Sequence, residues 1–154
     1  MTRSCFFIGH KESEEAVIPV LREAIEKHIT EYGVTVFYVG GYGGFDRVVA
    51  GELVRAKKAH PEICLIRLLP YHPAERPVET PDGFDNTFHP EGMERVPRKY
   101  AIARANRYMV DNVDHLIAYV WHGFGNSNKI LQHALARQKR GLIKVTLLND
   151  GVKA

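Results

Sequence analysis

Cysteine is scarce in this chain, which carries only Cys5 and Cys64 among its 154 residues. Each lies inside a short apolar run, so we expect two buried free thiols rather than a disulfide. The absence of any Cys-x-x-Cys pair excludes a zinc ribbon. Three histidines, at positions 10, 72 and 122, follow predicted strands, but no His-x-His or HExxH spacing accompanies them. We therefore predict no metal site.

Long hydrophobic runs are also missing. The apolar stretch near the N-terminus is too short for a signal peptide, and no segment is long enough to span a membrane. We expect a cytoplasmic protein without a membrane partner. The net charge of +3 is mildly basic and lacks the dense clusters of a large nucleic-acid-binding surface. It suits an anionic ligand, although lysines and arginines on solvated helix faces explain it equally well.

What the sequence does contain is a regular alternation of short apolar runs and helical stripes. The apolar runs cover residues 5–8, 34–39, 63–69, 116–121 and 142–148. Short runs that are apolar on both faces are typical of buried parallel strands. Amphipathic stripes fill the gaps, and the last of these predicted helices begins with Asn126 or Ser127 as its cap. The pattern predicts one α/β domain over residues 1–154, with a doubly wound parallel sheet of five strands and helices on both faces.

The segment from about residue 70 to residue 96 departs from this alternation. It has no clear periodicity, and four prolines, at positions 73, 77, 81 and 90, interrupt it. Connections of this length are usually functional or disordered. The aromatic residues and histidines within it favour an ordered, proline-rich flap that closes over a ligand, with an oligomer contact or a mobile insert as the alternatives.

The strongest functional signal follows the second apolar run. Residues 40–44 read Gly-Gly-Tyr-Gly-Gly and lead directly into Phe45, Asp46 and a predicted helix. Glycines let a backbone approach a ligand closely, and a helix N-terminus attracts phosphate. A tight turn would need only one glycine, so we predict an anion site. The loop is not a Walker loop, because no Gly-Lys-Ser/Thr follows, and it is not the GxGxxG fingerprint of a first strand.

Other predicted strand ends should meet this loop, because ligands of open α/β sheets bind at the carboxyl ends of strands. His10, after the first run, is a candidate hydrogen-bond donor to a ligand. The loop after the fourth run either caps the next helix or contacts a second anion or a ribose. The residues predicted to bind ligand at these strand ends, besides Phe45 and Asp46, are Gly9, His10, Gly40, Gly41, Tyr42, Gly43, Gly44, Gly123, Gly125, Asn126 and Ser127.

Three charged positions each have more than one interpretation. Asp46 at the start of the second helix either caps that helix or binds a ribose hydroxyl or acts as a general base. Arg104 and Arg107 on the third helix either reach a phosphate or lie on a solvated face. Asp46 is the main catalytic candidate. Glu52, further along the same helix, is expected to be solvated or structural, with catalysis as its less favoured role.

Three motifs in this order resemble the SLOG superfamily, the Rossmann-like domains related to DprA and LOG proteins. They are Cys-Phe-Phe-Ile-Gly-His at 5–10, the glycine loop leading into Phe45-Asp46, and Asn-Arg-Tyr-Met-Val-Asp-Asn-Val-Asp at 106–114. The chain looks like the small stand-alone bacterial and phage members, and the resemblance covers nearly all of it. It implies a sheet of order 3-2-1-4-5 and ligand contacts from residues 9–10, from residues 40–46 and from the loop after the fourth strand.

The resemblance implies a small-molecule nucleotide ligand and no required cofactor. LOG enzymes cleave nucleoside monophosphates, other members sense nucleotides or act in bacterial conflict, and the DprA branch binds single-stranded DNA. Here the LOG signature Pro-Gly-Gly-x-Gly-Thr-x-x-Glu is altered, because Val39, Gly44 and Arg47 replace its proline, threonine and glutamate. We therefore expect binding of a nucleotide or nucleotide-derived ligand. A phosphoribohydrolase is the alternative and a single-stranded-DNA accessory protein the second, less favoured one; homo-oligomers are compatible with each.

Overall fold

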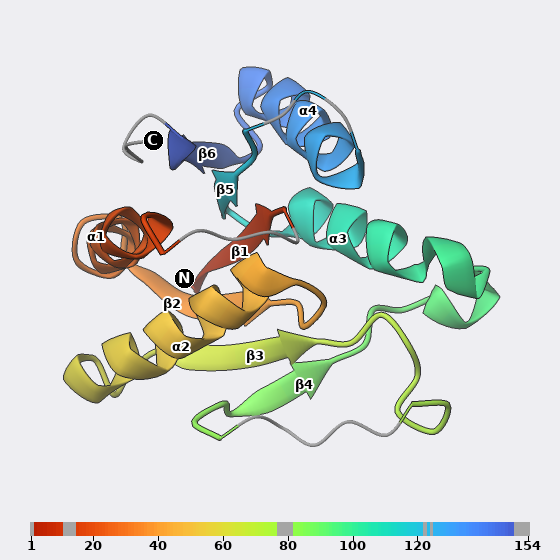
Figure 1. The fold of residues 1–154 in the computed structure, drawn as a ribbon, viewed down its shortest axis with the longest axis horizontal. Coiled ribbons are helices and arrows are strands. Elements are labelled where there is room, and N and C mark those ends of the chain that lie inside the picture. Colours follow the sequence, from red (N-terminus) through yellow and green to blue (C-terminus); the bar gives the residue numbers. More distant parts are fainter. Residues whose placement is uncertain (1, 11–14, 77–81, 122, 124, 150–154) are drawn as a thin grey trace.

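The computed structural model contains one six-stranded, all-parallel sheet of order β4-β3-β2-β1-β5-β6 (Figure 1). It describes residues 2–10, 15–76, 82–121, 123 and 125–149. Each predicted apolar run contains or overlaps a strand. The strands are β1 (Arg3–Gly9), β2 (Val34–Val39), β3 (Cys64–Leu68), β4 (Asn86–Phe88), β5 (His115–Tyr119) and β6 (Lys144–Leu147).

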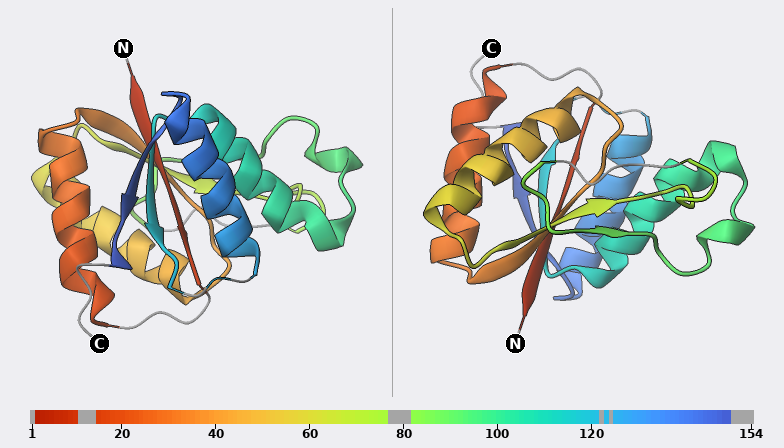
Figure 2. Two further views of the ribbon diagram at one scale, coloured as in Figure 1. Left: turned by 90° about the horizontal axis from the view of Figure 1, so that it is seen from above. Right: turned by 90° about the horizontal axis from the view of Figure 1, so that it is seen from below.

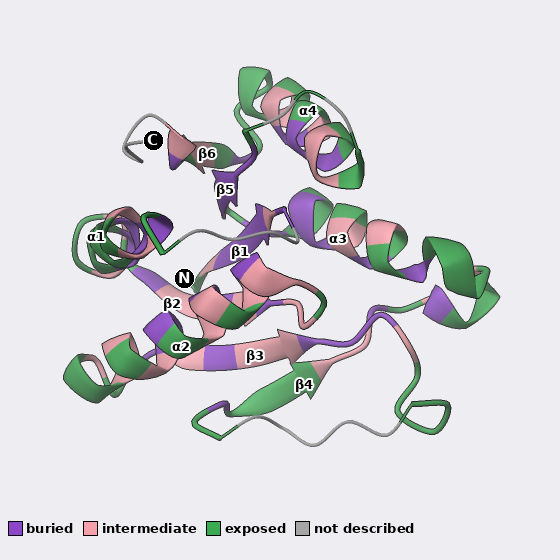
Figure 3. Ribbon diagram, in the orientation of Figure 1, coloured by how far each residue is buried: buried purple, intermediate pink, exposed green. Residues whose placement is uncertain are grey.

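The helices cover both faces of this Rossmann-like sheet, as predicted. On one face lie α1 (Val17–Thr30) and α2 (Gly44–Ala59), and on the other lie α3 (Ala101–Asn112) and α4 (Asn126–Lys139) (Figure 2). Side chains alternate along the strands, so that Phe7 and Phe37 pack beneath α1 and α2, whereas Phe6 and Leu116 pack beneath α3 and α4. Strand β5 is buried along its whole length and β1 along most of it (Figure 3). The ends of these two central strands are therefore rigidly placed.

The predicted count of five strands is wrong, because part of the proline-rich segment adds β4 to the sheet edge. The amide of Leu69 donates to the Phe88 carbonyl at 2.8 Å, and the amide of Asp85 donates to the Leu65 carbonyl at 2.9 Å. This strand has three residues, two of them exposed, so it has no hydrophobic pattern to read. The other five strands stand in the predicted order. Two short 3₁₀ turns, Met93–Arg95 and Arg98–Tyr100, follow β4, and residues 77–81 lie outside the described part of the chain.

Helix α3 begins at Ala101, directly after the 3₁₀ turn Arg98–Tyr100. The start of helix α4 differs from the prediction. Helix α4 begins after Gly125, which has a φ of 91°, and the expected capping hydrogen bond from Asn126 or Ser127 is not formed. The Ser127 hydroxyl is directed elsewhere, as described below.

Both cysteines are free thiols, as predicted. Cys5 is fully buried, but Cys64 is only half-buried, so the predicted burial is wrong for Cys64. Burial raises the pKa of each thiol above its ordinary value. In the part of the chain that the structure describes, no helix has both the length and the apolar character needed to cross a bilayer.

Candidate functional site

The site is built around the switch point of the sheet, where β1 lies between β2 and β5. From β1 the chain proceeds to β2, β3 and β4 on one side, and β5 and β6 form the other side. Such a reversal leaves a crevice outside the carboxyl ends of the two central strands, where ligands of open α/β folds bind. Gly9 at the end of β1 is paired with Tyr119 at the end of β5. The ends of β1 and β5 therefore lie side by side, as the sequence predicted for these strand ends.

Two hydrogen bonds join the loop after β5 to the end of β1. The Ser127 hydroxyl donates to the Gly9 carbonyl at 2.9 Å, and the Trp121 amide donates to Nε2 of His10 at 2.9 Å. Both contacts connect segments more than 100 residues apart in the chain. The strand ends predicted to meet are thus held together by side chains that the sequence had assigned to ligand binding or capping.

His10 is almost fully buried, with 5% of its surface exposed. Because Nε2 accepts the Trp121 amide, the proton of the neutral imidazole lies on Nδ1. The donor role predicted for His10 would therefore belong to Nδ1. The ring meets the Trp121 indole edge-on, with centroids 5.0 Å apart, and Trp121 itself is 52% exposed. Trp121 is an aromatic surface at the switch point that the sequence analysis did not single out.

The glycine loop takes the predicted path from β2 into α2. Gly43 precedes the helix with a φ of 142°, a conformation that favours glycine. Phe45, in the first turn, is 1% exposed and lies against Tyr119 with ring centroids 6.0 Å apart. The Phe45 side chain is therefore part of the core, so any ligand contact at this residue would come from its backbone. Tyr42, at the loop tip, is 38% exposed.

Asp46 lies folded back beneath the loop. Its Oδ2 accepts the Tyr42 amide at 3.3 Å, and a β-carbon at Gly40 would lie 2.8 Å from the same oxygen. Burial raises the pKa of Asp46 to about 6, while the Tyr42 amide and the nearby charge of Arg67 oppose this rise. The carboxyl group therefore exchanges its proton close to neutral pH, as a general acid or base would need to do.

Arg67 is a candidate site residue that the sequence did not reveal. It projects from β3 toward the glycine loop, so that a β-carbon at Gly41 would lie 1.6 Å from its Nη2. Its Nε is buried and has no hydrogen-bond partner among the described residues. The sequence signal for Arg67 is a single charge inside the apolar run Leu65-Ile66-Arg67-Leu68-Leu69, and this run as a whole predicts a buried strand.

Part of the proline-rich segment borders the loop. The rings of Tyr42 and Tyr71 meet nearly at right angles, with centroids 5.8 Å apart, and the Arg76 guanidinium lies over the Tyr71 ring at 4.2 Å. The segment after β3 is thus adjacent to the predicted anion site. Whether it closes over a ligand stays a prediction.

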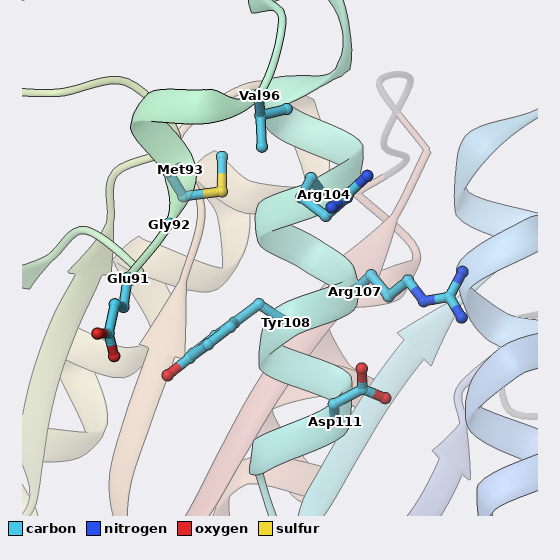
Figure 4. A pocket seen from close by; sticks show the side chains of 8 residues that line it. All are labelled: Glu91, Gly92, Met93, Val96, Arg104, Arg107, Tyr108 and Asp111. Atoms are coloured by element: carbon cyan, nitrogen blue, oxygen red, sulfur yellow. The ribbon is translucent and has the colours of Figure 1, made fainter.

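Arg104 and Arg107 lie on the exposed surface of α3, on the opposite face of the sheet from α2. Both line a pocket of about 260 Å³ between α3 and α4, together with Asn126, Lys129 and His133. They also line a second pocket of about 500 Å³, shown with its side chains in Figure 4, where the Arg107 guanidinium points toward α4. The structure therefore groups the two arginines with Asn126 and not with a residue of the glycine loop.

The remaining predicted residues have separate roles. Glu52 is buried and forms a bidentate ion pair with Arg22 of α1 at 2.8 and 3.2 Å, which fits the structural role expected of it. His72 accepts the Ala74 amide within its own loop, and His122 lies outside the described residues. Gly123 is exposed, and its carbonyl accepts the Asn128 side chain at 3.2 Å.

No protein-family model matches the chain, and no curated protein matches it significantly. The Rossmann-like parallel sheet and its switch point therefore stand on the structure itself.

Proposed function

We propose that this protein binds a nucleotide or nucleotide-derived ligand at the carboxyl edge of its sheet, as a sensor or a sequestering protein. The observation that carries the proposal is the placement of the glycine loop, the N-terminus of the 16-residue helix α2 and the Arg67 guanidinium at one point beside the switch point. The buried Nε of Arg67 has no hydrogen-bond partner among the described residues. Free helix N–H groups, a positive dipole end and an arginine together favour phosphate.

The parts of a nucleotide have distinct places in this proposal. The phosphate lies on residues 40–44 and at the start of α2. Asp46 and His10 are the polar groups near the sugar, and the exposed indole of Trp121 offers a face on which a base can stack. The sequence resemblance to the SLOG superfamily supports the same assignment, since its members hold nucleotides at these strand ends.

The test is a thermal-shift screen with nucleoside monophosphates, cyclic dinucleotides and ADP-ribose derivatives, preceded by native mass spectrometry for retained ligand. A bound ligand raises the melting temperature by mass action. Gly43→Asp places a carboxylate in the proposed phosphate position and should abolish the shift. Gly51→Asp is the matched control, because it adds the same charge to α2 at a position with open space around it. Absence of any shift from the whole panel would overturn the proposal.

The raised pKa of Asp46 favours one second candidate, a phosphoribohydrolase that cleaves a nucleoside monophosphate. A carboxyl group that titrates near pH 6 can exchange protons during catalysis, and its ionised form can stabilise an oxocarbenium-like ribose. Asp46→Asn should then abolish release of free base while ligand binding persists. Wild-type protein that binds a monophosphate but never releases base from it would exclude this reaction and leave the binding function.

A further inference from the structure

Arg67 occupies an unusual place for a cation. It lies in β3, an interior strand, beside Val39 of β2 and Thr87 of β4. Its strand neighbours Leu65 and Leu68 are buried, and Arg67 itself is half-buried. An arginine in such a strand loses hydration, and this cost must be offset by a partner or by a function.

Apart from the nearby charge of Asp46, no such partner is present in the described part of the chain. The buried Nε of Arg67 has no hydrogen-bond acceptor, and the guanidinium forms no ion pair with a described carboxylate. Asp46 is close enough to interact electrostatically, but its Oδ2 accepts the Tyr42 amide instead. No described residue therefore accepts a hydrogen bond from the Arg67 guanidinium.

The glycine loop is shaped around this side chain. A β-carbon at Gly41 would lie 1.6 Å from Nη2 and 2.2 Å from Cζ of Arg67, so any other residue there would displace the guanidinium. Gly41 has no positive φ that would otherwise require glycine. The close contact at Gly41 is therefore with the guanidinium of Arg67, which lies directly against the loop that leads into α2.

We propose that Arg67 is the phosphate ligand of this site and that it selects a terminal phosphate monoester. The inference rests on the function proposed above and specifies its substrate class. A guanidinium fork takes two oxygens of a phosphate, and the loop N–H groups need a third. A phosphomonoester has three non-bridging oxygens, whereas a phosphodiester has two. Nucleoside 5′-monophosphates are therefore preferred over cyclic phosphodiesters and over nucleosides.

The first experiment compares Arg67→Met and Arg67→Lys with wild-type protein by calorimetric titration. The probes are the four common nucleoside 5′-monophosphates, their 3′,5′-cyclic phosphodiesters, the corresponding nucleosides and inorganic phosphate. Arg67→Met should weaken monophosphate binding by at least tenfold and leave nucleoside binding unchanged, and Arg67→Lys should give an intermediate loss because it keeps the charge without the fork. Arg55→Met, which removes an exposed arginine of α2, is the matched control.

A second variant tests the same contact from the loop side. Gly41→Ala should displace the guanidinium and reproduce the Arg67→Met loss with Arg67 still present. Melting of the free protein separates a ligand role from a structural one. If Arg67 serves a ligand, Arg67→Met should melt at the same temperature as the wild type or higher. If Arg67 is structural, the variant should melt at a lower temperature.

The outcomes are distinguishable. If the wild type binds monophosphates and Arg67→Met binds them equally well, Arg67 is not the ligand, although the protein still binds nucleotides. If inorganic phosphate stabilises the wild type through Arg67 but no nucleotide binds, the phosphate ligand is confirmed and the nucleotide function is wrong. Binding of nucleosides or cyclic phosphodiesters as tight as that of monophosphates would overturn the proposed selectivity.

Discussion

The ring of Phe45 lies directly on the backbone of Gly9, so that a β-carbon at Gly9 would lie 2.4 Å from the ring carbons Cγ and Cδ2. Gly9 does not have a positive φ, so close approach alone accounts for the glycine. Phe45 belongs to the first turn of α2, and Gly9 ends β1. This contact therefore fixes the helix N-terminus, where we expect phosphate, against the switch point of the sheet.

Gly9→Ala should destabilise the fold, because neither the strand end nor the buried ring has space to move. Overpacking of a core site typically costs about 1–3 kcal/mol, and chemical denaturation of the variant measures it. In a Phe45→Ala background the same change should cost less, since the ring carbons that clash are gone. Gly123→Ala is the control, because nothing lies within 4 Å of the added carbon. Equal costs in both backgrounds would contradict the proposed contact.

Asp46→Asn should stabilise the free protein near neutral pH. The pKa of Asp46 is raised from 3.8 to about 6 in the folded protein, so folding favours the protonated acid. Its contribution to stability is complete below pH 4 and is lost as the pH rises through 6, a change of at most about 3 kcal/mol. The neutral amide avoids this loss and can still accept the Tyr42 amide.

Urea unfolding at pH 4 and at pH 7.5 tests this prediction. The free energy of unfolding of the variant should exceed that of the wild type at pH 7.5, and the two values should differ little at pH 4. A variant that is less stable than the wild type at pH 7.5 would show that the Asp46 carboxylate stabilises the fold rather than destabilising it.

The sequence predicts those strands of the sheet whose position is determined by hydrophobic burial. Residues 34–39 were predicted as a strand and form β2, because the strand is enclosed on both sides and its apolar run ends where its burial ends. Strand β4 has no such run. Backbone pairing and the Asp85 carboxylate hold it to β3, and neither leaves a pattern in a single sequence.

The candidate site, like the sheet, could be predicted from the sequence only in part. The glycine loop before a helix is a local feature and could be predicted, and so could the meeting of the strand ends. The roles of Ser127, Phe45 and Arg67 depend on which residues come together across the sheet. Ser127 resembled a helix cap because a hydroxyl at a helix start usually is one, and only the fold directs it to the Gly9 carbonyl.

Asp85→Ala should loosen β4 from the sheet without unfolding the core. The Asp85 carboxylate accepts the Leu65 amide at 2.8 Å and Lys57 Nζ at 2.5 Å, and these two contacts lower its pKa. Loss of a charged hydrogen bond of this kind costs roughly 1.5–3 kcal/mol, so local opening should increase about tenfold or more.

Amide hydrogen exchange measures this opening at Leu69, whose N–H is bonded to Phe88 of β4. Exchange at Leu116 in the central strand should stay unchanged. Asp82→Ala removes an exposed carboxylate of the preceding turn and is the matched control. If Leu69 exchanges no faster in Asp85→Ala than in the control, the backbone pairing alone holds the edge strand.

His28→Leu should protect the fold against acid. His28 is 1% exposed, its Nδ1 donates to the Ala24 carbonyl at 2.7 Å, and its buried Nε2 has no partner in the described part of the chain. Burial lowers its pKa from 6.5 to about 4, with the charges of His115 and Lys144 acting in the same direction. The neutral ring therefore supports folding fully above pH 6.5, and that support is lost as the pH falls toward 4, by about 3 kcal/mol at most.

The difference in unfolding free energy between the variant and the wild type should shift toward the variant by this amount between pH 7.5 and pH 4. Titration of the His28 ring by NMR gives the direct check, because a ring that protonates near pH 6.5 in the folded protein would remove the cause of the effect.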